Sequence, residues 1–215
     1  MRPEAILDDL IVRYPHLQCI EEDIYGAFVC LQTCFKNNGS LYCCGNGGSA
    51  SDALHLVGEL MKSFVLDRKI DCQFTESYLY LFPNDSAVLE QLHGALPAYA
   101  LVENTAFGTA FSNDQSAEMV FAQQVYGYMK PGDVLLGIST SGNSRNIINA
   151  LKVAKAKQSA TIGLLGGDGG EMKQLCDHSI IVPETMTYKV QELHVPIYHT
   201  LALMLEESFF GDGPL

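Results

Sequence analysis

The sequence has no apolar run that approaches the roughly 20 residues needed for a membrane-spanning helix. Its first ten residues, MRPEAILDDL, lack the basic start of a secretory signal peptide. Basic residues are scarce as well, because 13 Lys and Arg stand against 25 Asp and Glu and give a formal net charge of −12. An acidic surface repels a phosphate backbone at long range. We therefore expect a cytoplasmic protein with no nucleic-acid partner and no membrane partner.

The sequence also lacks a C-x-x-C motif, and its seven cysteines are odd in number. Two interpretations are open: a metal or redox site, or buried free thiols in a reducing compartment. Several of the cysteines lie in apolar runs such as SLYCC, which favours buried thiols.

The 215 residues, 47% hydrophobic and 18% charged, suit one well-buried domain. Apolar residues recur at helical spacing over residues 3–13 and 16–36, which predicts two N-terminal helices. Such a hairpin, within residues 1–38, often packs on a partner subunit rather than on its own sheet, so we expect it to mediate oligomerisation. Residues 39–215 would form the α/β core. We find no repeat or linker that divides the chain.

From Ser40 onward apolar strands alternate with helices, which predicts an α/β three-layer sandwich with a parallel sheet between layers of helices. The expected strands cover residues 40–44, 97–102, 133–139, 161–166 and 178–182. The expected helices include residues 49–63, 145–158 and 189–209. Residues 65–95 are the least regular part, and we expect a loop and a short helix there.

Two glycine- and serine-rich turns follow the first and third strands, GNGGS at 45–49 and STSGNS at 139–144. Ligands bind at the carboxyl ends of parallel strands, and a helix that starts there offers free amides to an anion. Neither turn reads G-x-G-x-x-G or carries the lysine of a P-loop, so we expect no nucleotide cofactor. Ordinary helix caps are the alternative. Two such turns at equivalent places favour a phosphate monoester.

The motifs together resemble a known family. GNGGS, S-x-x-D-A-x-H-x-x-x-E-L, N-D, LLGISTSGNS, GGEM-x-x-L-C-D and V-Q-E-x-H are similar to the sugar isomerase (SIS) domain family. Within that family they resemble the phosphoheptose isomerase group, over roughly residues 40 to 210. The resemblance implies a flavodoxin-like sheet of five parallel strands, a homotetramer and, in some members, zinc. It also implies the isomerisation of sedoheptulose 7-phosphate to D-glycero-D-manno-heptose 7-phosphate.

His55 and Glu59 lie four residues apart, so they share one face of the helix that follows the first turn. Aldose–ketose isomerisation through an enediol needs one base and one acid, and a carboxylate and a histidine suit these roles. The resemblance assigns the base to Glu59 and the acid to His199 of the last helix. It also implies that one zinc ion per subunit binds to His55, Glu59, Gln191 and His199.

The expected zinc ligands Gln191 and His199 would lie about 12 Å apart on a straight helix, too far for one ion to reach both. Three solutions are open: the helix begins after Gln191, it bends at Pro196, or the ligands come from two subunits. We interpret His194, between them, as structural.

The resemblance also supplies the substrate contacts. They come from the two turns, from the Asn-Asp pair, and from residues shared with proton transfer and metal binding. The expected set is Asn46, Gly47, Gly48, Ser49, Glu59, Asn113, Asp114, Ser139, Thr140, Ser141, Ser144 and Gln191.

Three positions depart from the family's pattern. Asn104 replaces an aspartate, Ser63 replaces an arginine, and Tyr188 replaces an aspartate. These changes would affect the periphery of the sugar pocket, so the identity of the sugar is less secure than the type of reaction. A phosphosugar sensor, or an isomerase for another sugar phosphate, is therefore one alternative. Another is a non-catalytic regulator resembling the DnaA initiator-associating protein. Because such regulators tend to lack the carboxylate, Glu59 favours the enzyme.

Overall fold

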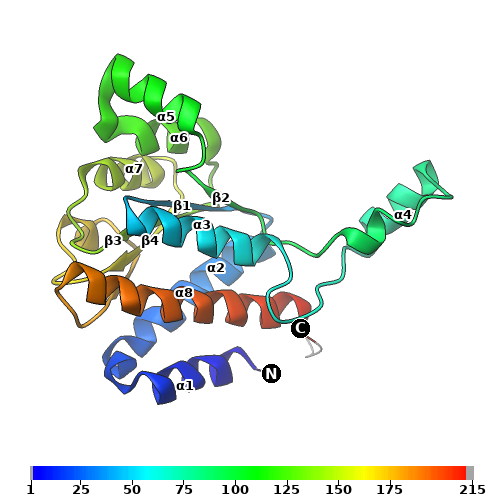
Figure 1. Ribbon diagram of the computed structural model, residues 1–215, viewed down its shortest axis with the longest axis horizontal. Helices are drawn as coiled ribbons and strands as arrows, with labels where there is room; N and C mark the ends of the chain where they lie inside the picture. The colour runs from blue at the N-terminus through cyan, green and yellow to red at the C-terminus, as the bar shows by residue number, and fades with distance from the viewer. Residues whose placement is uncertain (1, 212–215) are drawn as a thin grey trace.

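The computed structural model describes residues 2–211, and its centre is one sheet of five parallel strands (Figure 1). The order across the sheet is β2-β1-β3-β4-β5, the flavodoxin-like order that the resemblance implies. Every neighbouring pair is parallel. The predicted α/β class and five-stranded sheet are therefore confirmed. The strands are β1 (Leu41–Gly45), β2 (Ala98–Ala100), β3 (Val134–Ser139), β4 (Ala160–Leu165) and β5 (His178–Ile181).

Alternating side chains of the strands supply two separate cores. In β1, Leu41 and Cys43 belong to one buried cluster, whereas Tyr42 and Cys44 belong to the other. This follows from the two-residue period of a strand, and it accounts for the continuous apolar runs, because both faces are covered.

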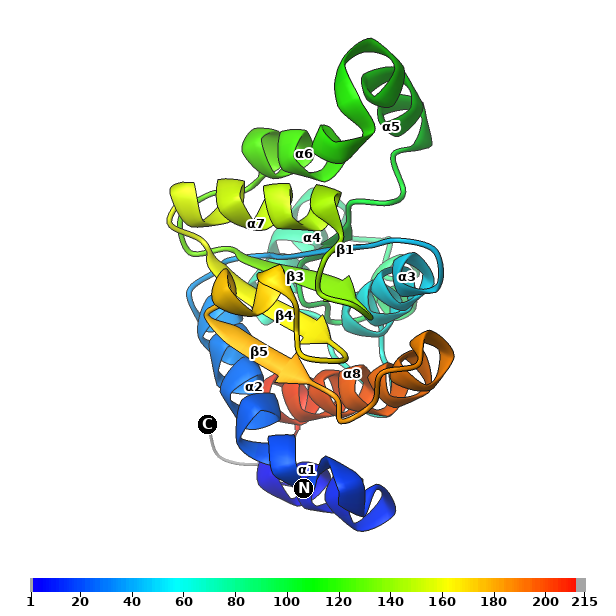
Figure 2. The ribbon, with the colours of Figure 1, turned by 90° about the vertical axis from the view of Figure 1, so that its left-hand side faces the viewer.

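Helices cover both faces of the sheet, as Figure 2 shows. One layer contains α1 (Pro3–Arg13), α2 (Glu21–Lys36), α3 (Gly48–Met61) and α8 (Thr187–Phe210). The opposite layer contains α6 (Val120–Tyr128) and α7 (Arg145–Ala156). The remaining elements are α4 (Cys72–Leu81), α5 (Thr105–Phe111) and the short turns η1 (Pro15–Ile20), η2 (Leu89–Gln91), η3 (Ser112–Ser116), η4 (Ala117–Met119) and η5 (Glu171–Gln174).

The N-terminal helices pack on their own chain. Residues 15–20 form the 3₁₀ turn η1, so the helix predicted from residue 16 begins only at Glu21. Ile24 and Phe28 of α2 are buried in the core beside α8 and β5. The expectation that this hairpin packs on a partner instead of its own sheet is therefore wrong, because its apolar residues already have partners within the chain. Its role in oligomerisation stays a prediction.

The segment around α4 extends from the body of the molecule (Figure 1). Asp71 caps the helix, its carboxylate accepting a hydrogen bond from Phe74 N at 2.8 Å. None of residues 72–81 is buried, and Tyr80 is 87% exposed. The loop and short helix predicted for residues 65–95 are therefore present, as an arm with apolar side chains on its surface.

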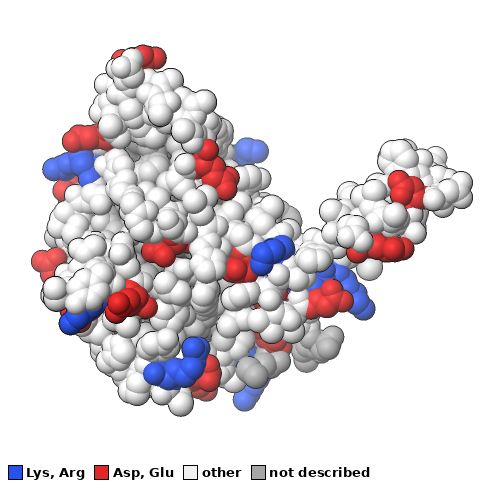
Figure 3. Space-filling view, in the orientation of Figure 1, with Lys and Arg blue, Asp and Glu red and all other residues white. Residues whose placement is uncertain are grey.

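Charge and hydropathy agree with the composition. Lys and Arg side chains are scattered among Asp and Glu on the face that Figure 3 shows. Within residues 2–211, no helix is both long enough and apolar enough to cross a membrane.

Candidate active site

Two parallel helices, α3 and α8, carry the candidate catalytic side chains. At one end Gln191 lies against Gly48, in the space that a Cβ on that residue would need. Further along, Tyr198 contacts Asp52, and beyond the end of α3 Glu206 contacts the backbone of Phe64. These contacts give a nearly constant register, because each α8 residue meets a residue between 142 and 146 positions earlier.

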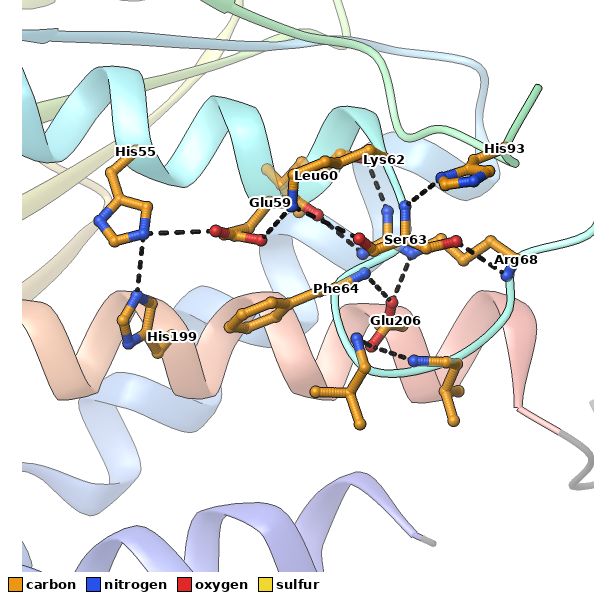
Figure 4. Close-up of polar contacts among 12 residues, drawn as sticks. His55, Glu59, Leu60, Lys62, Ser63, Phe64, Arg68, His93, His199 and Glu206 are labelled. Atoms are coloured by element: carbon orange, nitrogen blue, oxygen red, sulfur yellow. Dashed lines mark hydrogen bonds and ion pairs between the residues drawn. The ribbon is translucent and has the colours of Figure 1, made fainter. Parts of the chain in front are cut away.

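His55 lies between the two predicted proton-transfer residues (Figure 4). Its Nε2 is 3.3 Å from Glu59 Oε1 and 3.4 Å from Nε2 of His199. The Glu59 side chain is only 12% exposed, whereas that of His55 is 47% exposed. The structure thus gathers His55, Glu59 and His199, which lie up to 144 residues apart in sequence.

Glu59 has a second partner that sequence reasoning missed. Lys62 Nζ lies 2.9 Å from Glu59 Oε2, so the carboxylate stands between an imidazole and an ammonium group. The spacing of Glu59 and Lys62 could have predicted this contact, because residues three apart on a helix are neighbours.

The pKa of His199 is below its ordinary value. Burial is the main cause, and the nearby His55 adds to it, while Glu59 acts in the opposite direction. A lowered pKa makes the imidazolium a stronger acid, but it also leaves a smaller fraction of His199 protonated near neutral pH.

Tyr198 and Asp52 form a layer behind His55. Tyr198 Oη lies 3.0 Å from His55 Nδ1 and 3.5 Å from Asp52 Oδ1. Burial raises the pKa of Asp52, and its Oδ2 atom has no hydrogen-bond partner among the described residues. Sequence reasoning gave neither residue a role. Asp52 lies three residues before His55 on α3, whereas only the packing of α8 on α3 brings Tyr198 to His55.

The second turn folds around its hydroxyl groups. Ser139 Oγ lies 3.0 Å from Ser144 Oγ and accepts a hydrogen bond from Gly142 N at 3.2 Å. Gly142 has φ +66°, and a Cβ there would collide with the carbonyl of Gly169, so glycine is required. Thr140 is partly buried and Ser141 is exposed. The hydroxyls and the start of α7 form a donor-rich edge suited to a phosphate.

The first turn is connected through two side-chain amides to the start of α7, the helix that follows the second turn. Asn46 and Asn146 exchange two hydrogen bonds of 3.0 and 2.9 Å, and Asn146 is another residue that the sequence did not point to. Gly47, at φ +55°, immediately precedes α3, and Ser49 in its first turn is buried.

A cavity of about 740 Å³ adjoins this turn. Asn46, Gly47 and Asn113 line it, and Asn113 also donates a hydrogen bond to Asp114 at 3.0 Å. Among the described residues, neither Glu59 nor His199 lines this cavity. Three of the expected sugar contacts therefore line a cavity that the proton-transfer pair does not line.

Gln191 lies at Gly48, whereas His199 lies beside His55. Since α8 begins at Thr187, the solution in which the helix starts after Gln191 is wrong. Across residues 2–211, no group of three or more His, Cys, Asp and Glu side chains is arranged to hold a metal ion. His55, Glu59 and His199 have the donor atoms that zinc prefers. Their arrangement in one chain nevertheless does not form a metal site.

Comparison with known proteins identifies the family. The family model described as "SIS domain" matches residues 85–166. A phosphoheptose isomerase from a Nitratiruptor species is 41% identical over 86% of this chain and 86% of its own length. The chain belongs to the phosphoheptose isomerase family. A relative from Clostridium acetobutylicum of the same name is 42% identical over 83% of this chain and 78% of its own length.

Solved structures of phosphoheptose isomerases have the same fold. The protein from Neisseria gonorrhoeae superposes with a TM-score of 0.73 at 30% identity, covering 95% of this chain and 96% of its own. That from Francisella tularensis gives a TM-score of 0.76 at 27% identity, with the same coverage. The SIS fold and the family resemblance are therefore confirmed.

Two of the three departures from the phosphoheptose isomerase pattern have a structural role. Asn104 caps α5, since its Oδ1 accepts a hydrogen bond from Phe107 N at 3.1 Å. The Ser63 hydroxyl accepts a hydrogen bond from Arg68 N at 3.1 Å. The third, Tyr188, is exposed near the start of α8. None of them touches the carboxylate of Glu59.

Proposed function

We propose that this protein is a phosphosugar aldose–ketose isomerase that converts sedoheptulose 7-phosphate to D-glycero-D-manno-heptose 7-phosphate. The observation that carries the proposal is the contact of Glu59 and His199 with the same nitrogen of His55. Family membership supports it, because the relatives are named phosphoheptose isomerases.

The reaction moves hydrogen between two neighbouring carbons and their oxygens. Glu59 removes a proton from C1 of the ketose, while His199 donates a proton to the carbonyl oxygen at C2, and an enediol forms. The carboxylic acid then returns its proton to C2, and the O1 hydroxyl gives its proton to His199 as the aldehyde forms. His55 keeps the base and the acid within reach of adjacent atoms.

We assign the phosphate to the STSGNS turn, where the hydroxyl groups of Ser139, Thr140, Ser141 and Ser144 and the free amides at the start of α7 would donate to it. Asn46, Gly47, Gly48, Ser49, Asn113, Asp114 and Gln191 complete the proposed sugar contacts. A homotetramer belongs to the same proposal. The exposed apolar arm at α4 supports an association between chains, and the molecular mass in solution tests it.

Zinc also belongs to the proposal, on the strength of the family resemblance, with His55, Glu59, Gln191 and His199 as ligands. When bound, the ion would polarise the sugar oxygens. Because the single chain does not arrange a metal site, we derive no step through it. Metal analysis of the purified protein should find about one zinc per chain, and a metal-free yet active protein would remove this part.

Incubation with C5 to C7 sugar phosphates in deuterated water tests the function. We expect deuterium to enter the product of sedoheptulose 7-phosphate at C2, as followed by NMR, and not to enter when Glu59→Gln replaces the wild type. Absence of exchange with every sugar phosphate contradicts an isomerase. A stoichiometric protein partner together with that absence would favour the regulator.

A further inference from the structure

The carboxylate of Glu206 is buried beneath the segment that follows α3, with its side chain 1% exposed. It accepts hydrogen bonds from the amides of Phe64 at 2.8 Å, Val65 at 2.9 Å and Leu66 at 3.1 Å. Arg68 Nε donates a fourth at 2.6 Å. A buried carboxylate is costly unless it is paired and hydrogen-bonded, and these four donors satisfy that requirement.

Arg68, whose side chain is 0% exposed, connects Glu206 to the end of α3. Its Nη1 donates to the carbonyl oxygen of Leu60 at 2.8 Å, and its Nη2 donates to that of Glu59 at 2.7 Å. The last carbonyls of a helix lack partners within the helix, so the guanidinium caps α3. In doing so it fixes the backbone of the residue that carries the proposed base.

Phe64 connects the same ion pair to the proposed acid, His199 (Figure 4). Glu206 lies seven residues after His199 on α8, which is about two helical turns. Phe64, whose amide donates to Glu206, places its ring centroid 5.6 Å from that of His199. Contacts of one buried pair therefore extend to both residues of the proton-transfer pair.

We infer that Arg68 and Glu206 are positioning residues for the isomerisation, because they hold Glu59 and His199 in register across two helices. The inference rests on the proposed function. A base and an acid that serve neighbouring atoms tolerate little displacement, since a misplacement of about 1 Å can lower the rate roughly 100-fold.

The alternative is that the pair of Arg68 and Glu206 contributes only to stability. The two roles differ in their effect on kinetics, because a positioning residue changes kcat per folded molecule, whereas a purely stabilising residue changes only the folded fraction. Glu206→Gln keeps the shape but removes the charge, and Arg68→Lys keeps the charge but loses the planar fork. Each should lower kcat at least tenfold with little change in KM, because the phosphate turn is untouched. Val134→Ala, in the core at the amino end of β3, is the matched control for lost stability and should keep the wild-type kcat per folded molecule.

Removing one partner of a buried pair can unfold a protein, whereas replacing both with apolar residues often preserves stability. The double variant Arg68→Met with Glu206→Leu should therefore stay folded, and its kcat should also fall at least tenfold. Rates are normalised to the folded fraction measured by circular dichroism. A wild-type kcat in any folded variant of the pair overturns the inference.

A second readout does not depend on activity. The imidazole ¹⁵N signals of His199 should shift in Glu206→Gln and stay in place in Val134→Ala. Unchanged signals in Glu206→Gln also overturn the inference. Failure of the proposed function is distinguishable, because it appears in the wild type as absence of exchange with every sugar phosphate.

Discussion

Tyr198 Oη lies 3.0 Å from His55 Nδ1, on the side of the ring opposite the nitrogen that faces Glu59 and His199. The partner of one ring nitrogen sets which tautomer a neutral imidazole adopts. The hydroxyl has a single hydrogen. Donated to Nδ1, it keeps the hydrogen of His55 on Nε2, facing the carboxylate of Glu59; donated to Asp52 Oδ1, it leaves Nδ1 as the donor and Nε2 as an acceptor. The buried tyrosine thus governs what His55 presents to the proposed base.

Tyr198→Phe should therefore weaken catalysis without abolishing it. The change removes the hydroxyl and leaves His55 Nδ1 and Asp52 Oδ1 without this partner. We expect kcat to fall about tenfold, and the free energy of unfolding to fall by about 1 kcal/mol, the net value of a typical hydrogen bond. Steady-state kinetics and urea denaturation measure both. Tyr126→Phe, on the exposed face of α6, is the control.

Glu59→Gln should nearly eliminate turnover while substrate still binds. The amide keeps the shape of the side chain but cannot accept a proton from carbon, so kcat should fall by roughly 10³-fold. Calorimetry with sedoheptulose 7-phosphate should give an affinity close to that of the wild type. Glu21→Gln, at the start of α2, is the matched control. A Glu59→Gln enzyme that retains most of its kcat would exclude this carboxylate as the base.

Ser144→Ala tests the phosphate turn. The hydroxyl lies 3.0 Å from Ser139 Oγ, where the two side chains would donate to the same anion. A hydrogen bond to a charged group is worth about 2 kcal/mol, so KM should rise roughly 30-fold while kcat changes little. Ser159→Ala, at the amino end of β4, should leave both constants unchanged. An unchanged KM in Ser144→Ala would remove this residue from the binding site.

His194 should make the protein less stable in acid. It is fully buried beside Leu165 O at 3.2 Å, and burial lowers its pKa to about 4. Because the unfolded histidine titrates near 6.5, the unfolded chain binds more protons between pH 6.5 and 4. Stability is therefore complete above about pH 6.5 and is lost as the pH falls through that interval, by at most about 3 kcal/mol.

Urea denaturation at pH 4.5 and 7.5 measures this loss. His194→Gln keeps an N–H donor for Leu165 O but has no titrating group, so it should lose less stability than the wild type between the two pH values. His16→Gln, on the exposed surface, should lose as much as the wild type. Equal losses in wild type and His194→Gln would contradict the assignment.

The cysteines should react in two groups. All seven are free, and Cys19 and Cys72 are exposed. Burial raises the pKa of Cys30 to about 11 and those of Cys34 and Cys176 to about 12, and Cys43 and Cys44 are fully buried. Because the thiolate is the nucleophile, Ellman's reagent should modify two thiols rapidly in the folded protein and the other five only after unfolding. Rapid modification of more than two would contradict this burial.

Much of the fold could be read from the sequence because its signals are local. The apolar run of β3 predicts a strand buried on both faces, and the spacing of His55 and Glu59 predicts one helix face. The turn that begins at Ser139 could be recognised because its glycine and its hydroxyl residues form the turn by local contacts, such as the hydrogen bond from Gly142 N to Ser139 Oγ. The prediction was wrong where contacts with a distant element determine the packing. The N-terminal helices are the example, because their buried faces pack on α8 and the sheet.

The sequence by itself determined the succession of strands and helices along the chain, the two donor-rich turns and the chemical type of the proton-transfer residues, because each depends on a few consecutive positions. Only the tertiary structure decided which side chains meet. Packing α8 along α3 brings Tyr198 to His55, and the buried pair of Arg68 and Glu206 to the end of α3. Contacts across more than a hundred residues depend on helix register, which is set by the whole core.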